Sequence, residues 1–185
     1  MNQLEELLQQ LFFMIKQQKN IVLDDLSQWN KIRKIDKTEE DAFLYSFNKW
    51  PEFRSLVAYR LKDRANELDS LNKAILHQAN LKTANDLYIQ CDDIGGGFFL
   101  QHAYSTYIFA KKIGKNFWIN QNVTIGQYRG GIPTIGDNVE IRTGAVCFGN
   151  IHIGNNVKIG ANATVNFDVP DNATVIPSKS IIIEK

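Results

Sequence analysis

Apolar residues follow a helical spacing up to about residue 85. They recur three or four residues apart near the N-terminus, at Leu4, Leu7, Leu8, Leu11, Phe12 and Ile15, and again in the segment PEFRSLVAYRL (51–61). Such spacing places them on one face of an α-helix. Thr38 and Asp41 resemble a capping box, and Pro51 suits the first turn of a helix. The first part of the chain therefore predicts an all-α region.

A six-residue period replaces the helical spacing farther along the chain. Apolar residues occupy Ile113, Ile119, Ile125, Ile135, Ile141, Cys147, Ile153, Ile159 and Val165, and glycine follows five of these nine positions. A helix needs a period near 3.6 and an ordinary strand a period of about 2. A period of six fits a triangular solenoid, in which each hexapeptide supplies one short strand, one turn and one inward side chain. We therefore expect stacked coils of parallel strands around a column of isoleucines.

The six-residue grid is interrupted once. Ile125 and Ile135 lie ten residues apart instead of six, so four extra residues within QYRGGIPT (127–134) should leave the coil as a loop. Loops that leave a rigid solenoid commonly contact substrates. Arg129 in this loop is therefore a candidate substrate-binding residue.

Composition and charge exclude several classes of protein. The formal net charge of +1 gives no sign of nucleic acid or an anionic membrane as a partner. No uninterrupted apolar run approaches the roughly 20 residues of a membrane span, and the N-terminus is typical of an amphipathic helix rather than a signal peptide. With only Cys91 and Cys147, we expect free buried thiols and a cytoplasmic protein. Three scattered histidines supply no ligand cluster, so we expect no metal.

The repeat resembles the bacterial hexapeptide-repeat acyltransferases, and more narrowly their serine acetyltransferase-like members. The resemblance covers roughly residues 50–175 and rests on PEFRSLVAYRL (51–61), IGGGFFLQHAYST (94–106), IGKNFWINQNVTIG (113–126) and GNIHIGNNVKIGANATVNFDVPDNATVI (149–176). It implies a left-handed parallel β-helix that transfers acetyl from acetyl-CoA to a hydroxyl, in a homotrimer or dimer of trimers with active sites between neighbouring β-helices. A helical domain (1–85) would mediate assembly, followed by the β-helix domain (86–175) and a C-terminal tail (176–185).

The resemblance assigns the catalytic base to His102, in the segment Leu100-Gln101-His102. A neutral imidazole takes the proton of a hydroxyl as that hydroxyl attacks a thioester. Gln101 stands where the family has an aspartate that is expected near the amino group of serine. Ile132 stands at about the place of the family's second histidine, so Arg129 is the polar residue that remains nearby.

The carboxylate that orients the family's catalytic histidine also has no direct counterpart. Leu87 occupies its place, and Asp86 is one residue away. Asp86 is therefore the candidate orienting residue, with Asp92 and Asp93 as alternatives. All three also suit turns.

Further residues are implicated in binding the donor. The pantetheine arm in this family lies against small residues, which implicates Gly144, Ala145, Gly160 and Ala161. Lys179 is a candidate for the nucleotide phosphates. A glycine-bearing turn such as Gly126 leaves backbone N–H donors open to the thioester oxyanion.

The acceptor is assigned from the residues around His102. Tyr104 and Trp118 are candidates for a sugar-binding platform, with Gln101 beside them. Relatives with a single histidine and a Gln-His pair resemble enzymes associated with surface-polysaccharide synthesis. The sequence therefore favours O-acetylation of a sugar or surface-polysaccharide precursor. Two alternatives stay open: a serine O-acetyltransferase of cysteine biosynthesis, and a non-catalytic β-helix assembly module.

Overall fold

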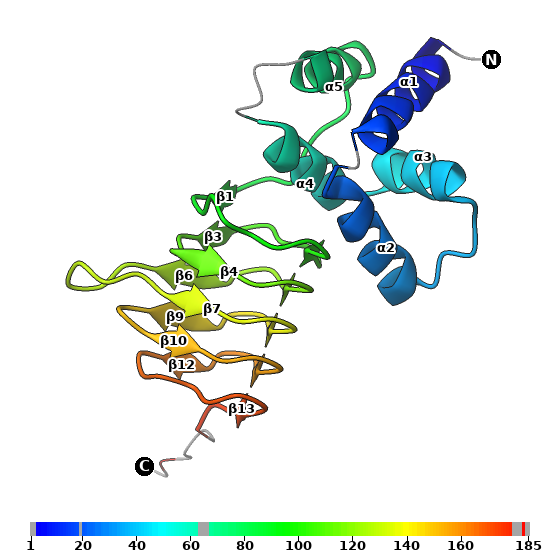
Figure 1. Cartoon of the computed structure of the whole chain (residues 1–185). Coiled ribbons are helices and arrows are strands. Elements are labelled where there is room, and N and C mark those ends of the chain that lie inside the picture. Colours follow the sequence, from blue (N-terminus) through cyan, green and yellow to red (C-terminus); the bar gives the residue numbers. More distant parts are fainter. Residues whose placement is uncertain (1–2, 19, 63–66, 179–182, 184–185) are drawn as a thin grey trace.

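The computed structural model describes residues 3–18, 20–62, 67–178 and 183. Its helices are α1 (Gln3–Gln17), α2 (Val22–Arg33), α3 (Glu39–Lys49), α4 (Pro51–Leu61) and α5 (Glu67–Gln78). They form a cluster at one end of a column of short strands (Figure 1). Two predicted helix starts are confirmed: the Thr38 hydroxyl accepts a hydrogen bond from the Asp41 N–H at 3.2 Å, and Pro51 opens α4.

The strands form three parallel sheets, one on each side of a prism (Figure 1). Sheet A contains β1 (Leu87–Ile89), β3 (Thr106–Ile108), β6 (Thr124–Gly126), β9 (Val146–Phe148) and β12 (Thr164–Val165). Sheet B contains β4 (Lys112–Ile113), β7 (Thr134–Ile135) and β10 (His152–Ile153). Sheet C contains β2 (Phe99–Leu100), β5 (Trp118–Ile119), β8 (Glu140–Ile141), β11 (Lys158–Ile159) and β13 (Thr174–Val175). The predicted fold class, an all-α region followed by a parallel β-helix, is confirmed.

The six-residue grid forms the core of the prism. Ile119, Ile141 and Ile159 pair in register down sheet C, and each side chain is fully buried. Every other grid residue is at most 3% exposed. Cys147 belongs to this column, and burial raises the pKa of its thiol to about 12. It is therefore a core residue and not a nucleophile.

Three corners connect the sheets along each coil. The C–A corner consists of residues 101–105, 120–123, 142–145 and 160–163, and the A–B corner includes the loop at 127–133. The B–C corner consists of 114–117, 136–139 and 154–157. Backbones approach closely there: a Cβ on Gly114 would lie 2.5 Å from the carbonyl carbon of Gly136. Glycine at this position is thus required by coil stacking.

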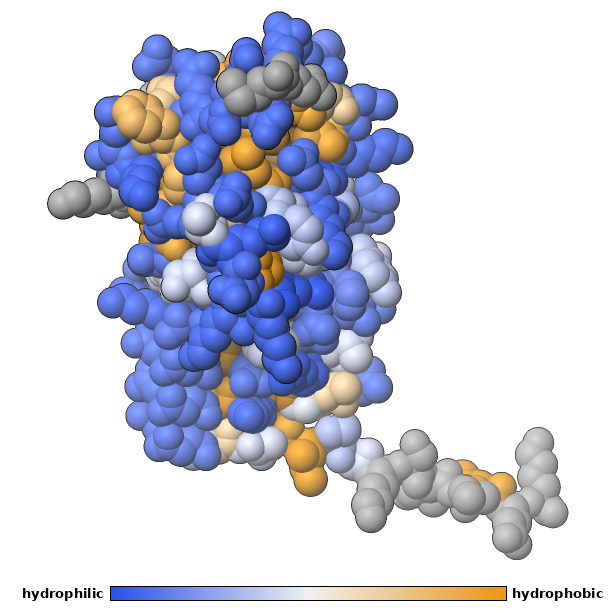
Figure 2. Space-filling model, turned by 90° about the vertical axis from the view of Figure 1, so that its right-hand side faces the viewer, coloured by the Kyte–Doolittle hydropathy of each residue, from blue (hydrophilic) through white to orange (hydrophobic). Residues whose placement is uncertain are grey.

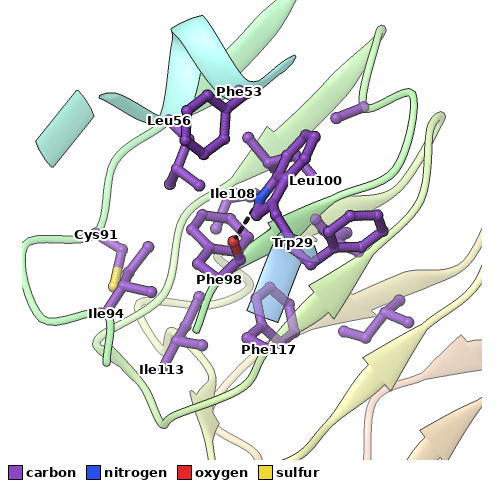
Figure 3. Close-up of a cluster of buried hydrophobic side chains, with 14 of the residues drawn as sticks. Trp29, Phe53, Leu56, Cys91, Ile94, Phe98, Leu100, Ile108, Ile113 and Phe117 are labelled. Atoms are coloured by element: carbon purple, nitrogen blue, oxygen red, sulfur yellow. Dashed lines mark hydrogen bonds between the residues drawn. The ribbon is translucent and has the colours of Figure 1, made fainter. Parts of the chain in front are cut away.

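The helices close the top of the prism with an apolar layer (Figure 3). Trp29 of α2 and Phe53 and Leu56 of α4 pack with Phe98 and Leu100 of the first coil, and all five are fully buried. The Trp29 indole N–H donates to the Phe98 carbonyl at 3.1 Å. This layer covers apolar surface that the first coil would otherwise expose.

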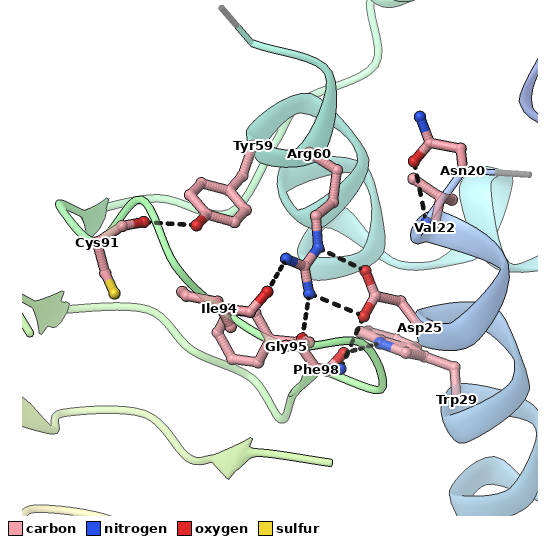
Figure 4. A network of polar contacts seen from close by, with 10 residues as sticks. All are labelled: Asn20, Val22, Asp25, Trp29, Tyr59, Arg60, Cys91, Ile94, Gly95 and Phe98. Atoms are coloured by element: carbon pink, nitrogen blue, oxygen red, sulfur yellow. Dashed lines mark hydrogen bonds and ion pairs between the residues drawn. The ribbon is translucent and has the colours of Figure 1, made fainter. Parts of the chain in front are cut away.

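A buried ion pair joins the same two parts of the chain (Figure 4). Arg60 donates to both carboxylate oxygens of Asp25, at 2.8 and 3.0 Å. It also donates to the carbonyls of Ile94 and Gly95, while Asp25 accepts from the Phe98 N–H at 2.8 Å. The charges are thus hydrogen-bonded as well as paired, which burial requires. The network fixes the helices on the first coil, where His102 lies.

Outside this junction the prism surface is mainly polar. Figure 2 views the side on which Figure 1 draws β13, and its larger apolar patches lie over the helices rather than over the coils. Within the described ranges, no helix has the length and apolarity to cross a membrane.

Candidate active site

His102 lies at the C–A corner of the first coil, directly after β2. Its side chain is exposed, and its backbone adopts a positive φ of 64°. Hydrogen bonds attach this corner to the next coil: the Gln101 N–H donates to the Ile119 carbonyl, and the Asn122 N–H donates to the Tyr104 carbonyl. The β-helix therefore presents the predicted base to solvent from a hydrogen-bonded frame.

An irregularity ahead of the predicted grid produces this corner. Leu100 pairs with Ile119, and Ile108 pairs with Ile125, so eight residues on the first coil span the same arc as six on the second. Within the grid itself, which begins at Ile113, the interruption between Ile125 and Ile135 is found as predicted. The two additional residues bulge at the corner, and Ala103 and Ser105 join His102 at positive φ. Such backbone is unfavourable for residues with a Cβ and is often found at functional sites.

Asp86 lies at the same corner, one layer above His102. Its carbonyl accepts the Thr106 N–H at 3.0 Å, and its side chain is exposed. Within the described residues, no hydrogen bond joins its carboxylate to His102. Asp92 and Asp93 lie elsewhere, since Asp93 pairs with Lys112 of sheet B at 3.1 Å. Asp86 thus has the better position to orient the histidine, and that role stays a prediction.

Gln101 and Trp118 are joined by a hydrogen bond on the outer side of sheet C. The Trp118 indole N–H donates to the Gln101 side-chain oxygen at 3.0 Å. The Arg142 guanidinium lies 4.5 Å from the Trp118 ring centroid and pairs with Glu140. The sequence did not predict a role for Arg142, because its contact with Trp118 comes from another coil. Comparison of corresponding corner positions would have found it, since Asn120 and Gly160 occupy the same place on the adjacent coils.

The four predicted pantetheine contacts also lie at the C–A corner, on the two coils farthest from the helices. Gly144, Gly160 and Ala161 are partly exposed, whereas Ala145 is fully buried with its side chain in the prism. Gly144 has a φ of 71°, and a Cβ there would lie 2.2 Å from the Asn162 side-chain oxygen. Turn geometry alone thus accounts for this glycine. Gly144, Gly160 and Ala161 still form a ridge of small residues at this corner, two and three coils below His102.

Gly126 and the loop lie away from His102: Gly126 is the last residue of β6, and the loop follows at the A–B corner. A Cβ on Gly126 would meet only the Thr124 methyl at 3.9 Å, so coil packing does not require glycine there. The loop is a tight hairpin in which Tyr128 and Gly131 exchange two backbone hydrogen bonds of 3.0 Å. Arg129 occupies its tip at a φ of 48°, with its guanidinium 5.2 Å from the Tyr128 ring centroid. One chain therefore does not bring Arg129 to His102.

The other candidates are simply located. Tyr104 is 47% exposed beside His102. His77 and His152 are exposed and lie on α5 and in sheet B, respectively. Lys179 falls outside the described residues. Across the described ranges, no group of three histidine, cysteine or acidic side chains is arranged to hold a metal ion.

Comparisons with known proteins agree with this geometry. No family model matches the sequence. Serine acetyltransferase of Helicobacter pylori is 32% identical over 151 residues, which cover 75% of this chain and 88% of that protein. The enzyme of Synechococcus elongatus is 33% identical over 69% of this chain, and the match spans 54% of that protein.

Solved structures give the same result. Serine acetyltransferase of Neisseria gonorrhoeae in complex with serine has a TM-score of 0.61 and 27% identity over 94% of this chain and 72% of its own. A serine acetyltransferase in complex with CoA has a TM-score of 0.58 and 26% identity over 83% of this chain and 64% of its own. These relatives confirm the predicted family and enzyme class, and the chain belongs to the serine acetyltransferase family of hexapeptide-repeat acyltransferases.

Proposed function

We propose that the protein transfers the acetyl group of acetyl-CoA to the side-chain hydroxyl of L-serine. The sequence alone favours a sugar over serine as the acceptor. The relatives described above are serine acetyltransferases, and one solved structure holds serine itself. Serine is therefore the better-supported acceptor.

The position of His102 is the observation that carries the proposal. An exposed imidazole stands on a two-residue bulge of the solenoid, two and three coils above the ridge of small residues at the same corner. We assign His102 as the general base, which takes the proton of the serine hydroxyl while its oxygen attacks the thioester carbon. The carbon–sulfur bond then breaks, the acetyl ester forms, and the imidazolium returns its proton to the CoA thiolate.

The small-residue ridge suits the donor. Gly144, Gly160 and Ala161 are partly exposed and leave room for the pantetheine arm to approach the backbone. Gly126 lacks a side chain without any packing need for its absence, so its backbone is available to a second molecule. We assign these residues to acetyl-CoA. Gly126 lies away from His102 of its own chain, so we assign it to the thioester oxyanion in the site of a neighbouring β-helix.

The separation of Arg129 from His102 supports a trimeric active site. The two residues lie at different corners of one prism, so the hairpin would reach a histidine on a neighbouring β-helix. We therefore propose a homotrimer in which Arg129 completes a neighbour's site. The role of residues 1–85 in higher assembly stays a proposal of the same kind.

Release of the CoA thiol with L-serine as acceptor tests the function. We expect His102→Ala to lower kcat by about 100- to 10,000-fold, because it removes general-base catalysis. His152→Ala is the matched control, since this histidine is also exposed on the prism but lies in sheet B. Undiminished serine-dependent turnover in His102→Ala would exclude the assigned base. Failure of the wild-type protein to bind CoA in calorimetry would favour the non-catalytic assembly module.

A sugar acceptor remains the second candidate because of Gln101. This residue supplies no negative charge for an ammonium group, and exposed Tyr104 adjoins the base. However, Arg142 covers the Trp118 ring, so the predicted two-residue platform lacks an open second ring on that side. A glycan panel in the same thiol-release assay separates the two acceptors.

A further inference from the structure

We infer that Gln101 and Arg142 form an acceptor site for a carboxylate, and that this site makes no demand for an ammonium group. The inference rests on the proposed function and specifies which part of serine the enzyme recognises. It would extend the acceptors to short hydroxy acids that lack an amino group. Trp118 contacts both residues and fixes the orientation of each.

Gln101 is held as a hydrogen-bond donor. The indole N–H of Trp118 is a donor only, so the Gln101 atom that it contacts at 3.0 Å must be the amide oxygen. The amide nitrogen then points away from Trp118, and within the described residues it has no hydrogen-bond partner. A donor at this place suits a carboxylate oxygen, whereas an aspartate would have suited an ammonium.

Arg142 is held over the same indole. Its guanidinium stacks 4.5 Å from the Trp118 ring centroid, and among the described residues it donates only to Glu140. The side chain remains 36% exposed, so donors are left for a ligand. A guanidinium that is already oriented loses little freedom when it binds a planar carboxylate.

The charge on this part of sheet C is positive. Glu140 is the acidic residue here, and both Arg142 and Lys158 pair with it, the latter at 3.8 Å. Two cations thus share one carboxylate, which leaves an excess positive charge. Asp86 lies on the sheet A side of the corner, where its carbonyl accepts the hydrogen bond from the Thr106 N–H. The Gln101 side therefore attracts an anion.

Trp118 is itself fixed from the helical side. Its ring packs edge-on against Phe99 at 5.2 Å, and the Arg33 guanidinium lies 5.3 Å from the Phe99 ring centroid. This stack runs from α2 across the top of sheet C to Arg142. Trp118 therefore acts as a positioning residue that sets the orientation of both Gln101 and Arg142.

Three acceptors separate the two charges of serine. L-serine has both, 3-hydroxypropionate lacks the ammonium, and ethanolamine lacks the carboxylate. We expect ethanolamine to lose about 10- to 150-fold in kcat/KM relative to L-serine, the usual range for a hydrogen bond to a charged group. We expect 3-hydroxypropionate to lose less than about 5-fold, within the range of an uncharged contact. Equal losses for both analogues, or a larger loss for 3-hydroxypropionate, would overturn the inference.

Arg142→Met and Lys158→Met form a matched pair of charge removals. Arg142→Met should lower kcat/KM by about 10- to 100-fold for the two carboxylates and leave ethanolamine unchanged. Lys158→Met removes the second cation that pairs with Glu140 but does not stack on Trp118, so it should lower kcat/KM for the two carboxylates by less than about 3-fold, through screened charge alone, and leave ethanolamine unchanged. Arg142→Lys should recover only part of the loss, because an ammonium lacks the planar fork. A uniform loss for all three acceptors in Arg142→Met would indicate a merely structural role and contradict the inference.

Direct binding decides the inference even if serine turnover fails. Calorimetry of 3-hydroxypropionate with the CoA-saturated wild-type protein and with Arg142→Met measures carboxylate recognition without the reaction. Weaker binding to the variant supports the carboxylate site. Equal binding to both proteins, or no binding to either, overturns it, whereas absent serine turnover alone refutes the proposed function.

Discussion

The B–C and C–A corners of the prism turn the chain with different residues. At the B–C corner, the first coil uses Gly97 at a φ of 84°, and the later coils use asparagines at a φ near 60°, in the order Asn116, Asn138, Asn156 and Asn172. Their side-chain amides form a continuous ladder with hydrogen bonds of 2.9, 3.0 and 2.9 Å. At the C–A corner, the residues change from coil to coil, and the side chains of Asn122 and Asn162 form no comparable ladder within the described residues. Repetition at one corner supports stacking, while variation at the other leaves room for chemistry.

The C–A corner also carries the greater backbone strain. Its first coil has His102, Ala103 and Ser105 at positive φ, whereas each lower coil has a single such residue. Each costs roughly 1–2 kcal/mol for a residue with a Cβ. The strain is tolerated because the coil below and the helices above hold this corner in place. The ladder thus stabilises a scaffold on which one irregular turn positions His102, the proposed base.

Removal of the bulge should have the largest effect on activity and little effect on folding. Deletion of Tyr104 and Ser105 would return the first coil to six residues per side and withdraw His102 from its projecting position. We expect kcat to fall by about 100- to 10,000-fold, as for loss of the base, with the circular dichroism spectrum of the β-helix retained. Thiol release and circular dichroism measure the two properties.

A matched deletion at the B–C corner should do the reverse. Removal of Asn155 and Asn156 takes away ladder bonds to Asp171, Asn138 and Asn172 and shifts the register of all later strands. We expect this variant to lose its folded spectrum. If both deletions unfold the protein equally, the two corners do not differ as described.

The fold could be predicted because its signal repeats. Nine positions on one grid become nine side chains that are at most 3% exposed. The bulge at His102 escaped prediction because the position six residues before Ile113 is Tyr107, whereas the inward residue is Ile108. Both side chains are apolar, so the hydrophobic pattern did not reveal the difference. Helix starts were predictable from Thr38 and Pro51, but the partnership of Asp25 with Arg60 depends on tertiary packing alone.

Only His102 could be proposed from its neighbours in the sequence, and its role as the base stays a prediction. Its exposed corner is consistent with that assignment. The environment of Gln101 was not predictable, because Trp118 contacts it from the next coil and Arg142 lies over the Trp118 ring from the coil after that. The loop that carries Arg129 was predicted from the sequence. Its separation from His102 was not, because it depends on the loop lying at the A–B corner and His102 at the C–A corner.

A single substitution can interrupt the asparagine ladder at the B–C corner. Asn138→Ala removes hydrogen bonds to both Asn116 and Asn156. The alanine keeps a β-carbon at a φ of 57° but lacks the side-chain amide whose hydrogen bonds offset the cost of that backbone conformation. We expect the free energy of unfolding to fall by about 2–4 kcal/mol, from two hydrogen bonds and one strained residue. Chemical denaturation measures this loss. Asn138→Gly separates the parts, because glycine relieves the strain but not the lost bonds.

The corresponding substitution at the C–A corner should have the smallest effect. Asn122 adopts the same φ of 57°, but its exposed side chain makes no ladder bond among the described residues. We expect Asn122→Ala to lower the free energy of unfolding by about 1 kcal/mol, the cost of the left-handed backbone alone, and Asn122→Gly to change it by less than about 0.5 kcal/mol. The same denaturation experiment measures both. A loss for Asn122→Ala as large as that for Asn138→Ala would mean that backbone conformation, and not the amide ladder, distinguishes a stabilising corner from a functional one.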